Sequence, residues 1–344
     1  MSGVPQEQPR PTYTHLLTMT TGLGVYEHAL LREPRVEHGY CTDDVARALG
    51  VVVRERRPTP ELVRIRDVYL RFLDCAVSST GAVHNRMDAA GQWTDDPETD
   101  DCWGRAVAGL GAAVRRATEK TIRGRAFSTF VRAAQGRSVD VRASAFAALG
   151  AADVLAVRPD CQTARELLGD CLARLPRGLG TAWQWPESRL RYANASLCHA
   201  LIVGGEALGD IATRDEGLAQ LGVLLAIETG PHGHLSLAGT DGRGPDDKGP
   251  MWDQQPIEAA AISAACLDAL RVTHDRRWAA PVTQAWAWFT GDNDSATVMY
   301  DARDGAGYDG LERGGRNENC GAESTLAALS ALHDVHALKE LAAR

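Results

Sequence analysis

Two adjacent carboxylates lie in residues 38–49, where a polar loop turns into an apolar helical segment. Asp43 and Asp44 would occupy the first turn of that helix, where the positive end of the helix dipole stabilises negative charge. A structural explanation is a helix start capped by Thr42 or Asp43. A functional explanation is a pair of groups for general acid and base catalysis. The arrangement recurs along the chain, and this recurrence favours the functional explanation.

Carboxylates, amides and tryptophans gather again at the starts of most later apolar segments. The candidate catalytic residues are Asp43, Asp44, Asp101, Asp253 and Glu258. The candidate substrate-binding residues are His38, Tyr40, Trp103, Arg105, Trp185, Asn194, Trp252, Gln254, Gln255, Asn319 and Glu323. The start of the third segment, near Asp140 and Arg142, is expected to contribute little.

Such a set of side chains suits a carbohydrate. Indole faces stack on the apolar side of a sugar ring, while carboxylates, amides and guanidinium groups bond its hydroxyl groups. Two acids on opposite walls of a cavity supply a general acid and a general base. A separation of about 6.5–9.5 Å predicts an inverting reaction, and about 5–5.5 Å a retaining one. We expect a glycoside hydrolase or phosphorylase, with inversion favoured.

Some of these residues also have structural explanations. Pro256 suits the first position of a helix, so Glu258 could simply stabilise a helix start. Asn319 could be a helix cap, and Glu323 would be an unpaired buried acid unless it meets a ligand or an arginine. Asp253 has no capping explanation, which favours a role in the site.

A ring of structural ion pairs is the alternative for two of the candidate acids. Arg47 follows Asp44 on one inner helix, and Arg105 follows Asp101 on the next. Buried acids near such arginines could be neutralised by them and play no part in catalysis.

Other chemistries find less support in the sequence. The chain has no P-loop, no glycine-rich dinucleotide-binding turn after a strand and no G-x-S-x-G elbow. His232 and His234 alone are a weak indication of a metal site, and no Asp-x-Asp-x-Asp-Gly calcium loop is present. We therefore expect no metal and no cofactor.

Charge and cysteine content limit the partners and the compartment. The chain of 344 residues carries a formal net charge of -8, which disfavours nucleic acid and anionic membranes as partners. No apolar run reaches the length of a membrane span. The eight cysteines form no C-x-x-C pair, which indicates free thiols in a reducing cytoplasm. We expect a cytoplasmic protein that binds an oligosaccharide, with residues 1–12 as a disordered tail and residues 13–344 as one catalytic domain.

Two kinds of helical segment alternate along the chain. Six are apolar nearly all round and rich in small residues, which indicates burial on every side: residues 44–55, 103–115, 141–156, 194–208, 257–271 and 322–332. Six have one apolar stripe and a charged face: residues 61–76, 120–134, 163–174, 213–228, 278–289 and a short one near 334–343. Inner helices covered by outer ones predict an all-α fold, an (α/α)6 toroid of six helical hairpins. An open superhelix is the competing architecture.

The connections between these helices are unequal. Most of those that lead from an outer helix to the next inner one are long, at residues 77–100, 175–193, 229–256 and 290–321. Long loops in compact domains are usually functional, and these all emerge where the inner helices begin. Residues 233–237 and 297–301 predict small β-hairpins within them. The candidate site is therefore expected at this face of the ring.

Several motifs resemble those of a known bacterial family. They lie at residues 38–49, 101–105, 252–259, 291–294 and 319–324. The family belongs to the six-hairpin glycosidase superfamily, and its members are often labelled only as glycosyltransferase- or glycosidase-associated proteins. Its patterns read roughly as His-Gly-Tyr-Cys-x-Asp-Asp-Asn-Ala-Arg-Ala-Leu and Asp-Gln-Gln-Pro-Ile-Glu-Ala. The resemblance covers about residues 14–332. It implies an α/α toroid that acts on carbohydrate, with mannoside-type phosphorylases or glycosyltransferases encoded nearby.

We therefore predict an enzyme that cleaves a glycosidic bond of an oligosaccharide, with mannose-containing sugars as candidates, by hydrolysis or by phosphorolysis. For phosphorolysis, Arg105 and His38 are the candidate phosphate ligands. Two other classes stay open. A sugar epimerase or isomerase on the same ring would need histidines in the cavity, and the long loops offer His38, His84, His232 and His234. A non-catalytic toroid would bind a glycan or a partner protein.

Overall fold

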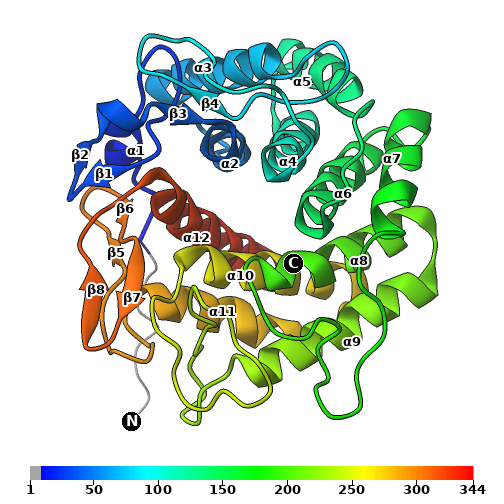
Figure 1. Cartoon of the computed structure of the whole chain (residues 1–344), viewed down its shortest axis with the longest axis vertical. Helices are drawn as coiled ribbons and strands as arrows, with labels where there is room; N and C mark the ends of the chain where they lie inside the picture. The colour runs from blue at the N-terminus through cyan, green and yellow to red at the C-terminus, as the bar shows by residue number, and fades with distance from the viewer. Residues whose placement is uncertain (1–8, 344) are drawn as a thin grey trace.

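The chain forms two concentric layers of helices (Figure 1). A computed structural model describes residues 9–343. The inner layer consists of α2 (Thr42–Val52), α4 (Asp101–Arg116), α6 (Val141–Leu155), α8 (Asn194–Leu208), α10 (Pro256–Thr273) and α12 (Ala322–Ala342). The outer layer consists of α3 (Pro60–Ala76), α5 (Lys120–Ala133), α7 (Gln162–Leu172), α9 (Ile211–Ile227) and α11 (Ala279–Phe289), with the short α1 (Thr14–Met19). The predicted all-α (α/α)6 toroid is confirmed.

The ring is closed. Each inner helix packs against the next in chain order, and α12, the last, packs against α2, the first. The open superhelix is thereby excluded. The predicted short helix near 334–343 is wrong, because α12 continues without a break to Ala342. No glycine or proline interrupts this segment, and such residues are the usual reason for a helix to end. The outer position beside α12 is taken instead by α1, which contacts both α12 and α3.

Small residues allow the inner helices to pack backbone against backbone. A Cβ atom on Gly111 of α4 would lie 2.2 Å from the carbonyl oxygen of Gly150 on α6. A Cβ atom on Gly109 would lie 2.6 Å from the carbonyl oxygen of Ala46 on α2. Both distances are far below van der Waals contact, so only glycine fits at these crossings. This is the structural reason for the small-residue composition of the inner segments.

Short strand pairs decorate the loops at the face where the inner helices begin. All are antiparallel: β1 (Ala29–Leu30) with β2 (Glu33–Pro34), β3 (Tyr40–Cys41) with β4 (Arg86–Met87), β5 (Tyr300–Asp301) with β6 (Ala306–Gly307), and β7 (Gly310–Glu312) with β8 (Gly315–Asn317). The hairpin expected at residues 297–301 is present as β5 and β6. At residues 233–237 there is only one isolated bridge, between Thr229 and Leu235.

Most of the expected tail, residues 1–8, lies outside the described residues, while Arg10 and Pro11 line a cavity of the ring. All eight cysteines are free thiols, as expected, and six of them are buried. None of the helices in residues 9–343 is both long enough and apolar enough to cross a membrane.

Replacing Gly111 by alanine should destabilise the protein by about 1–3 kcal/mol, because the added methyl group forces α4 and α6 apart. Gly124 on the outer helix α5 is the matched control, since a Cβ atom there would meet nothing within 4 Å. Gly124→Ala should raise stability by about 0.4–1 kcal/mol through the lower entropy of the unfolded chain. Urea unfolding of both variants measures the difference. If Gly111→Ala and Gly124→Ala changed the free energy of unfolding by the same amount, the close contact between α4 and α6 would not require glycine at position 111.

Candidate active site

The starts of all six inner helices converge on one face of the ring, here called the N-terminal mouth. Each helix brings polar side chains to it in its first turn: Asp43 and Asp44 (α2), Asp101 (α4), Arg142 (α6), Asn194 (α8), Glu258 (α10) and Glu323 (α12). Arg47 and Arg105 follow one turn later on α2 and α4. Residues from distant parts of the sequence are therefore brought to one place, as the loop pattern predicts.

The start of α2 is held by the loop that follows α3. The Thr42 hydroxyl donates a hydrogen bond to the carbonyl oxygen of His84 (2.5 Å), and the Thr42 N–H donates to the carbonyl oxygen of Asn85 (2.9 Å). The N-cap residue is Cys41, and its side chain makes no capping bond. The predicted cap by Thr42 or Asp43 is therefore wrong. Neither aspartate that follows is used as a cap, so both are available for other contacts.

Asp44 belongs to a buried ion-pair chain. Only 2% of it is exposed, and its Oδ1 lies 2.7 Å from Nη1 of Arg47. The other amino group of Arg47 lies 2.8 Å from Glu323. Burial is the main reason that the pKa of Asp44 rises to about 7. The ion-pair ring expected as the structural alternative therefore accounts for Asp44. Glu323 has the arginine partner that an acid at its position needs.

Asp43 and Asp101 are not neutralised in this way. In each, the Oδ1 atom is buried without a hydrogen-bond partner among the described residues. The Tyr192 hydroxyl donates to Oδ2 of Asp101. Burial raises the pKa of Asp43, and after burial the strongest influences are the charges of Arg47, Arg105, Asp101 and Asp100. Asp43 and Asp101 are thus close enough for each charge to be felt by the other, on neighbouring helices.

Arg105 lies beside these two acids. Its guanidinium carbon is 3.5 Å from the centroid of the Phe146 ring, and its Nε is buried without a partner in the described part of the chain. Burial, followed by the charge of Arg47, lowers the pKa of Arg105 to about 10. Arg105, Arg47 and Glu323 line a cavity of about 250 Å³ on the axis of the ring, here called the axial cavity.

Residues 192–194 connect four inner helices at the mouth, α4, α6, α8 and α10. The N–H groups of Ala193 and Asn194 donate to the two carboxylate oxygens of Glu258, the second at 3.3 Å. Arg142 Nε donates to the carbonyl oxygen of Tyr192 at 3.1 Å. Ala193 adopts a left-handed conformation with φ of 49°, which costs energy for a residue other than glycine. Glu258 therefore holds a strained turn in place, and that turn places Tyr192 on Asp101.

Several predicted sugar-binding residues belong to the core instead. Trp103 is fully buried, and its indole N–H donates to the carbonyl oxygen of Ala133. Trp185 and Tyr40 are 2% and 1% exposed, and Tyr40 stacks on Tyr26 with ring centroids 4.7 Å apart. These aromatic residues cannot stack on a sugar without rearrangement, because their faces are covered by protein.

Two predicted amide contacts are likewise used within the protein. Gln254 is fully buried, and its side chain bonds the Leu237 N–H, the Trp288 indole, the Met251 carbonyl oxygen and Asp294. Asn194 is also buried, and its Oδ1 accepts from the Arg191 N–H at 2.9 Å.

The remaining candidates lie on loops around the mouth. Asp253 accepts a hydrogen bond from Gln255 at 2.9 Å, and its Oδ1 faces Gly310 of β7. Trp252 is partly exposed, with Arg313 above its ring at 5.6 Å. Asn319 is not the cap of α12, a position held by Gly321; it accepts from the Leu31 N–H. His38 is exposed and makes an edge contact with His28.

The start of α6 supplies Arg142 to the mouth, and the expectation that it contributes little to the candidate site stays a prediction. Arg142 is 4% exposed and forms two hydrogen bonds with the Glu187 carboxylate, the second at 2.6 Å. Its guanidinium also lies 5.6 Å from the Tyr192 ring. A sequence signal for this role exists: Arg142 occupies the second position of its inner helix, as Asp43 does in α2.

One group of side chains has the spacing of a metal site. Glu27, Cys41 and Asp44 bring ligand atoms within 4.8 Å of one another. Glu27 is paired with Arg86, and Asp44 with Arg47. Burial and the charge of Asp44 raise the pKa of the Cys41 thiol well above its usual value. A thiol that keeps its proton is a poor metal ligand, so these residues do not fit a bound metal.

The comparisons with known proteins concern the fold. No protein-family model matches the chain, and no curated protein matches it in sequence. The structure is similar to cellobiose 2-epimerase from Spirochaeta thermophila (TM-score 0.70, 13% identity, covering 95% of this chain and 93% of that one). It is also similar to a D-mannose isomerase (0.64, 12%, covering 95% of each). A third similar structure is an inactive variant of an α-1,6-mannanase of Salegentibacter sp. HEL1_6 in complex with α-1,6-mannotetrose (0.66, 12%, 94% and 96%). Identities this low establish the toroid fold alone.

Glu228, at the end of α9, is a buried acid beside the mouth. It is fully buried; its Oε1 accepts from the Ala238 N–H at 2.8 Å, and its Oε2 has no partner in residues 9–343. Burial, reinforced by the charge of Glu258, raises the pKa of Glu228 to about 8. The folded protein therefore holds a proton here that the unfolded chain releases above the ordinary glutamate pKa.

The protonated Glu228 side chain favours the folded state, and this contribution to the free energy of unfolding is fully present below the ordinary glutamate pKa. It declines as the pH rises above that value and is lost once the pH has risen through about 8. Glu228→Gln should flatten the decline in unfolding free energy over this range by up to about 1.4 kcal/mol per pH unit. Denaturant unfolding between pH 5 and pH 9 tests this, with Glu206→Gln on the exposed end of α8 as control. An unchanged slope in Glu228→Gln would contradict the assignment.

Proposed function

We propose that the chain is a carbohydrate-active enzyme that cleaves a glycosidic bond of an oligosaccharide at the N-terminal mouth, with Asp43 and Asp101 as its acid and base. The observation that carries this proposal is the pair of unpartnered carboxylate oxygens on neighbouring inner helices, beside an arginine without an acid partner. A purely structural cluster would pair these groups, because an unsatisfied buried polar atom lowers stability.

The surroundings of the two acids suggest their roles. Burial and the nearby carboxylates raise the pKa of Asp43, so Asp43 is suited to hold a proton and to donate it to the leaving oxygen. Asp101 has one oxygen bound by the Tyr192 hydroxyl and the other free, so it is suited to activate the attacking nucleophile. Glu258 acts as a positioning residue through residues 192–194.

The similar structures add support of a general kind. One of them is an inactive mannanase variant, with two consecutive aspartates replaced, in complex with mannotetrose. In this chain, consecutive aspartates lie at the starts of two neighbouring inner helices, Asp43 with Asp44 and Asp100 with Asp101. We propose that residues 13–344 act as one catalytic domain in the cytoplasm and that mannose-containing oligosaccharides are the first substrates to test.

A sugar epimerase or isomerase is the second candidate, since two of the similar structures carry these names. The site chemistry favours it less. His84 is stacked on Trp93 and bonded to the carbonyl oxygen of Asp95, and His234 is paired with Asp294. The residues that act most strongly on Asp43 are aspartates and arginines. A non-catalytic glycan-binding toroid is the third candidate, and it would have no turnover to lose.

Asp43→Asn and Asp101→Asn should each reduce turnover by about 10²–10⁴-fold, the usual contribution of a general acid or base. Sugar binding should change far less, because asparagine keeps the shape of the side chain. Asp96→Asn is the matched control, since Asp96 is an exposed acid on a loop at the same mouth. Retention of full turnover by both site variants would overturn the assignment.

The substrate is sought by measuring reducing-sugar release from α-mannosides, β-mannosides and β-glucans, with and without inorganic phosphate. Products are identified by NMR in deuterated water. Shorter sugars indicate cleavage. A product of unchanged length that has taken up solvent deuterium would instead indicate the epimerase class.

A further inference from the structure

Arg105 differs from the other arginines that line the axial cavity. Arg47 is paired with Asp44 and Glu323, Arg54 with Asp334 and Arg116 with Asp153. For Arg105, the described residues supply a contact with the Phe146 ring and no hydrogen bond or ion pair. The charges of Asp43, Glu323 and Asp101 act on Arg105, yet none of these acids is bonded to it. A guanidinium that lines a cavity with its N–H donors unused by the described residues can bind an anion from outside the chain.

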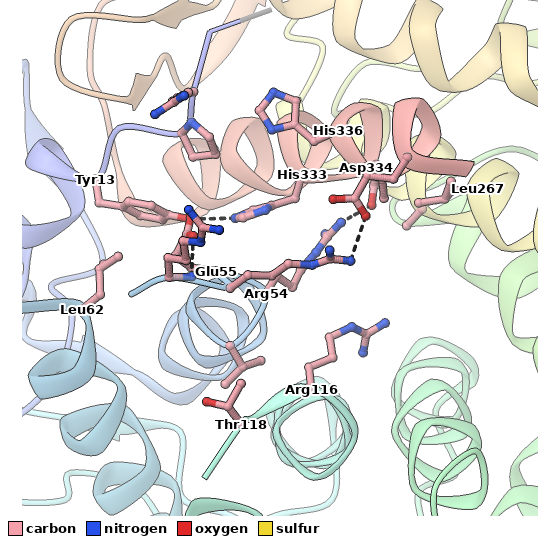
Figure 2. Close-up of a pocket in the computed structure, with 18 of the residues that line it drawn as sticks. Tyr13, Arg54, Glu55, Leu62, Arg116, Thr118, Leu267, His333, Asp334 and His336 are labelled. Carbon is pink, nitrogen blue, oxygen red and sulfur yellow. Dashed lines mark hydrogen bonds and ion pairs between the residues drawn. The ribbon is translucent and has the colours of Figure 1, made fainter. Parts of the chain in front are cut away.

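The axial cavity continues toward a larger space at the opposite face of the ring. This space, here called the vestibule, has a volume of about 1000 Å³ and shares Arg54, Arg116 and His199 with the axial cavity. Figure 2 shows Arg54 bonded to Asp334 and His333 bonded to Tyr13 on its walls. Six arginines line the vestibule, against four acids. Burial lowers the pKa of His333 and His336, two of its three histidines, so these do not add to the positive charge. A small anion would therefore meet an excess of arginines on this side, with Asp153 and Glu323 as the acids that line the axial cavity itself.

We propose that Arg105 and the axial cavity bind a small oxyanion, either inorganic phosphate or an anionic group carried by the sugar. A planar guanidinium with free N–H donors matches the oxygens of phosphate and carboxylate. The cavity volume of about 250 Å³ lies below the ~300–1,000 Å³ of ordinary small-molecule sites, which suits a small ion or one substituent. The role of this anion in the reaction rests on the proposed function. The binding of the anion to Arg105 does not depend on it.

The test measures anion binding in the absence of any sugar substrate. Inorganic phosphate and D-glucuronate are the probes, with D-glucose as the neutral control and sodium chloride at matched ionic strength. Thermal shift and isothermal titration calorimetry give the affinity. Arg105→Gln should weaken binding at least about tenfold, the loss of a charge-assisted hydrogen bond. Arg105→Lys keeps the positive charge, so it should lose less affinity for the anion. It replaces Arg105→Gln in the test if that variant does not fold.

Arg158→Gln is the matched control. Arg158 also lies over a phenylalanine, with its guanidinium carbon 4.0 Å from the Phe127 ring centroid, but it is exposed and outside the cavity. Its replacement should leave anion binding unchanged.

The outcomes separate the possible ligands and the two proposals. Binding of phosphate, with a sugar phosphate formed during cleavage, assigns a co-substrate. Binding of glucuronate alone assigns a group on the sugar. Binding of neither probe, or equal binding by Arg105→Gln, overturns the oxyanion site. Asp43→Asn should bind the anion at least as tightly as the unmodified protein, because a negative charge is removed. Anion binding can therefore be measured and interpreted even if the catalytic proposal fails.

Discussion

The close approach of the inner helices is the constraint on which the rest of the structure depends. Where Gly111 meets Gly150 and Gly109 meets Ala46, the backbones themselves are in contact. Six helix starts are thereby drawn around one axis, and their dipoles make the N-terminal mouth favourable for negative charge. The concentration of carboxylates at this mouth follows from that geometry. With larger side chains on the inner helices, the same acids would be spread over a wider opening.

Acids held so close together need compensation, and the structure supplies it unevenly. Arg47 neutralises Asp44 and Glu323, while the N–H groups of Ala193 and Asn194 bind Glu258. Among the acids in the first turns of the inner helices, Asp43 and Asp101 keep a buried oxygen without a partner in residues 9–343, and they lie on adjacent helices. This unevenness favours a reaction site over a structural ion-pair ring.

The sequence predicts the architecture well because apolar periodicity reports directly on which faces are buried. It predicts the side-chain roles less well, because the type of a residue does not show whether its side chain points into the core or into the mouth. Trp103 and Tyr40 have the chemistry of sugar-stacking residues, yet their rings face the core. Gln254 lies in a conspicuous motif, yet its amide is bonded to four other residues of the protein. The contacts of Arg142 are equally hidden in the sequence, because its partner, Glu187, lies 45 residues further along the chain.

The position of Arg105 on its helix gives a separate reason to regard it as unusual. Arg115 and Arg116 lie in the last turn of the same helix, where the negative end of the dipole stabilises a cation. Arg105 lies one turn from the start of α4, near the positive end. Arg47 adds repulsion at the same level of the ring. The charges of Asp43, Glu323 and Asp101 attract Arg105, but none of these acids forms a hydrogen bond or ion pair with it in the described part of the chain, and its Nε has no partner there. A guanidinium that lines a cavity without a direct partner is best explained by a ligand of opposite charge, and the axial cavity is the space in which that ligand would lie.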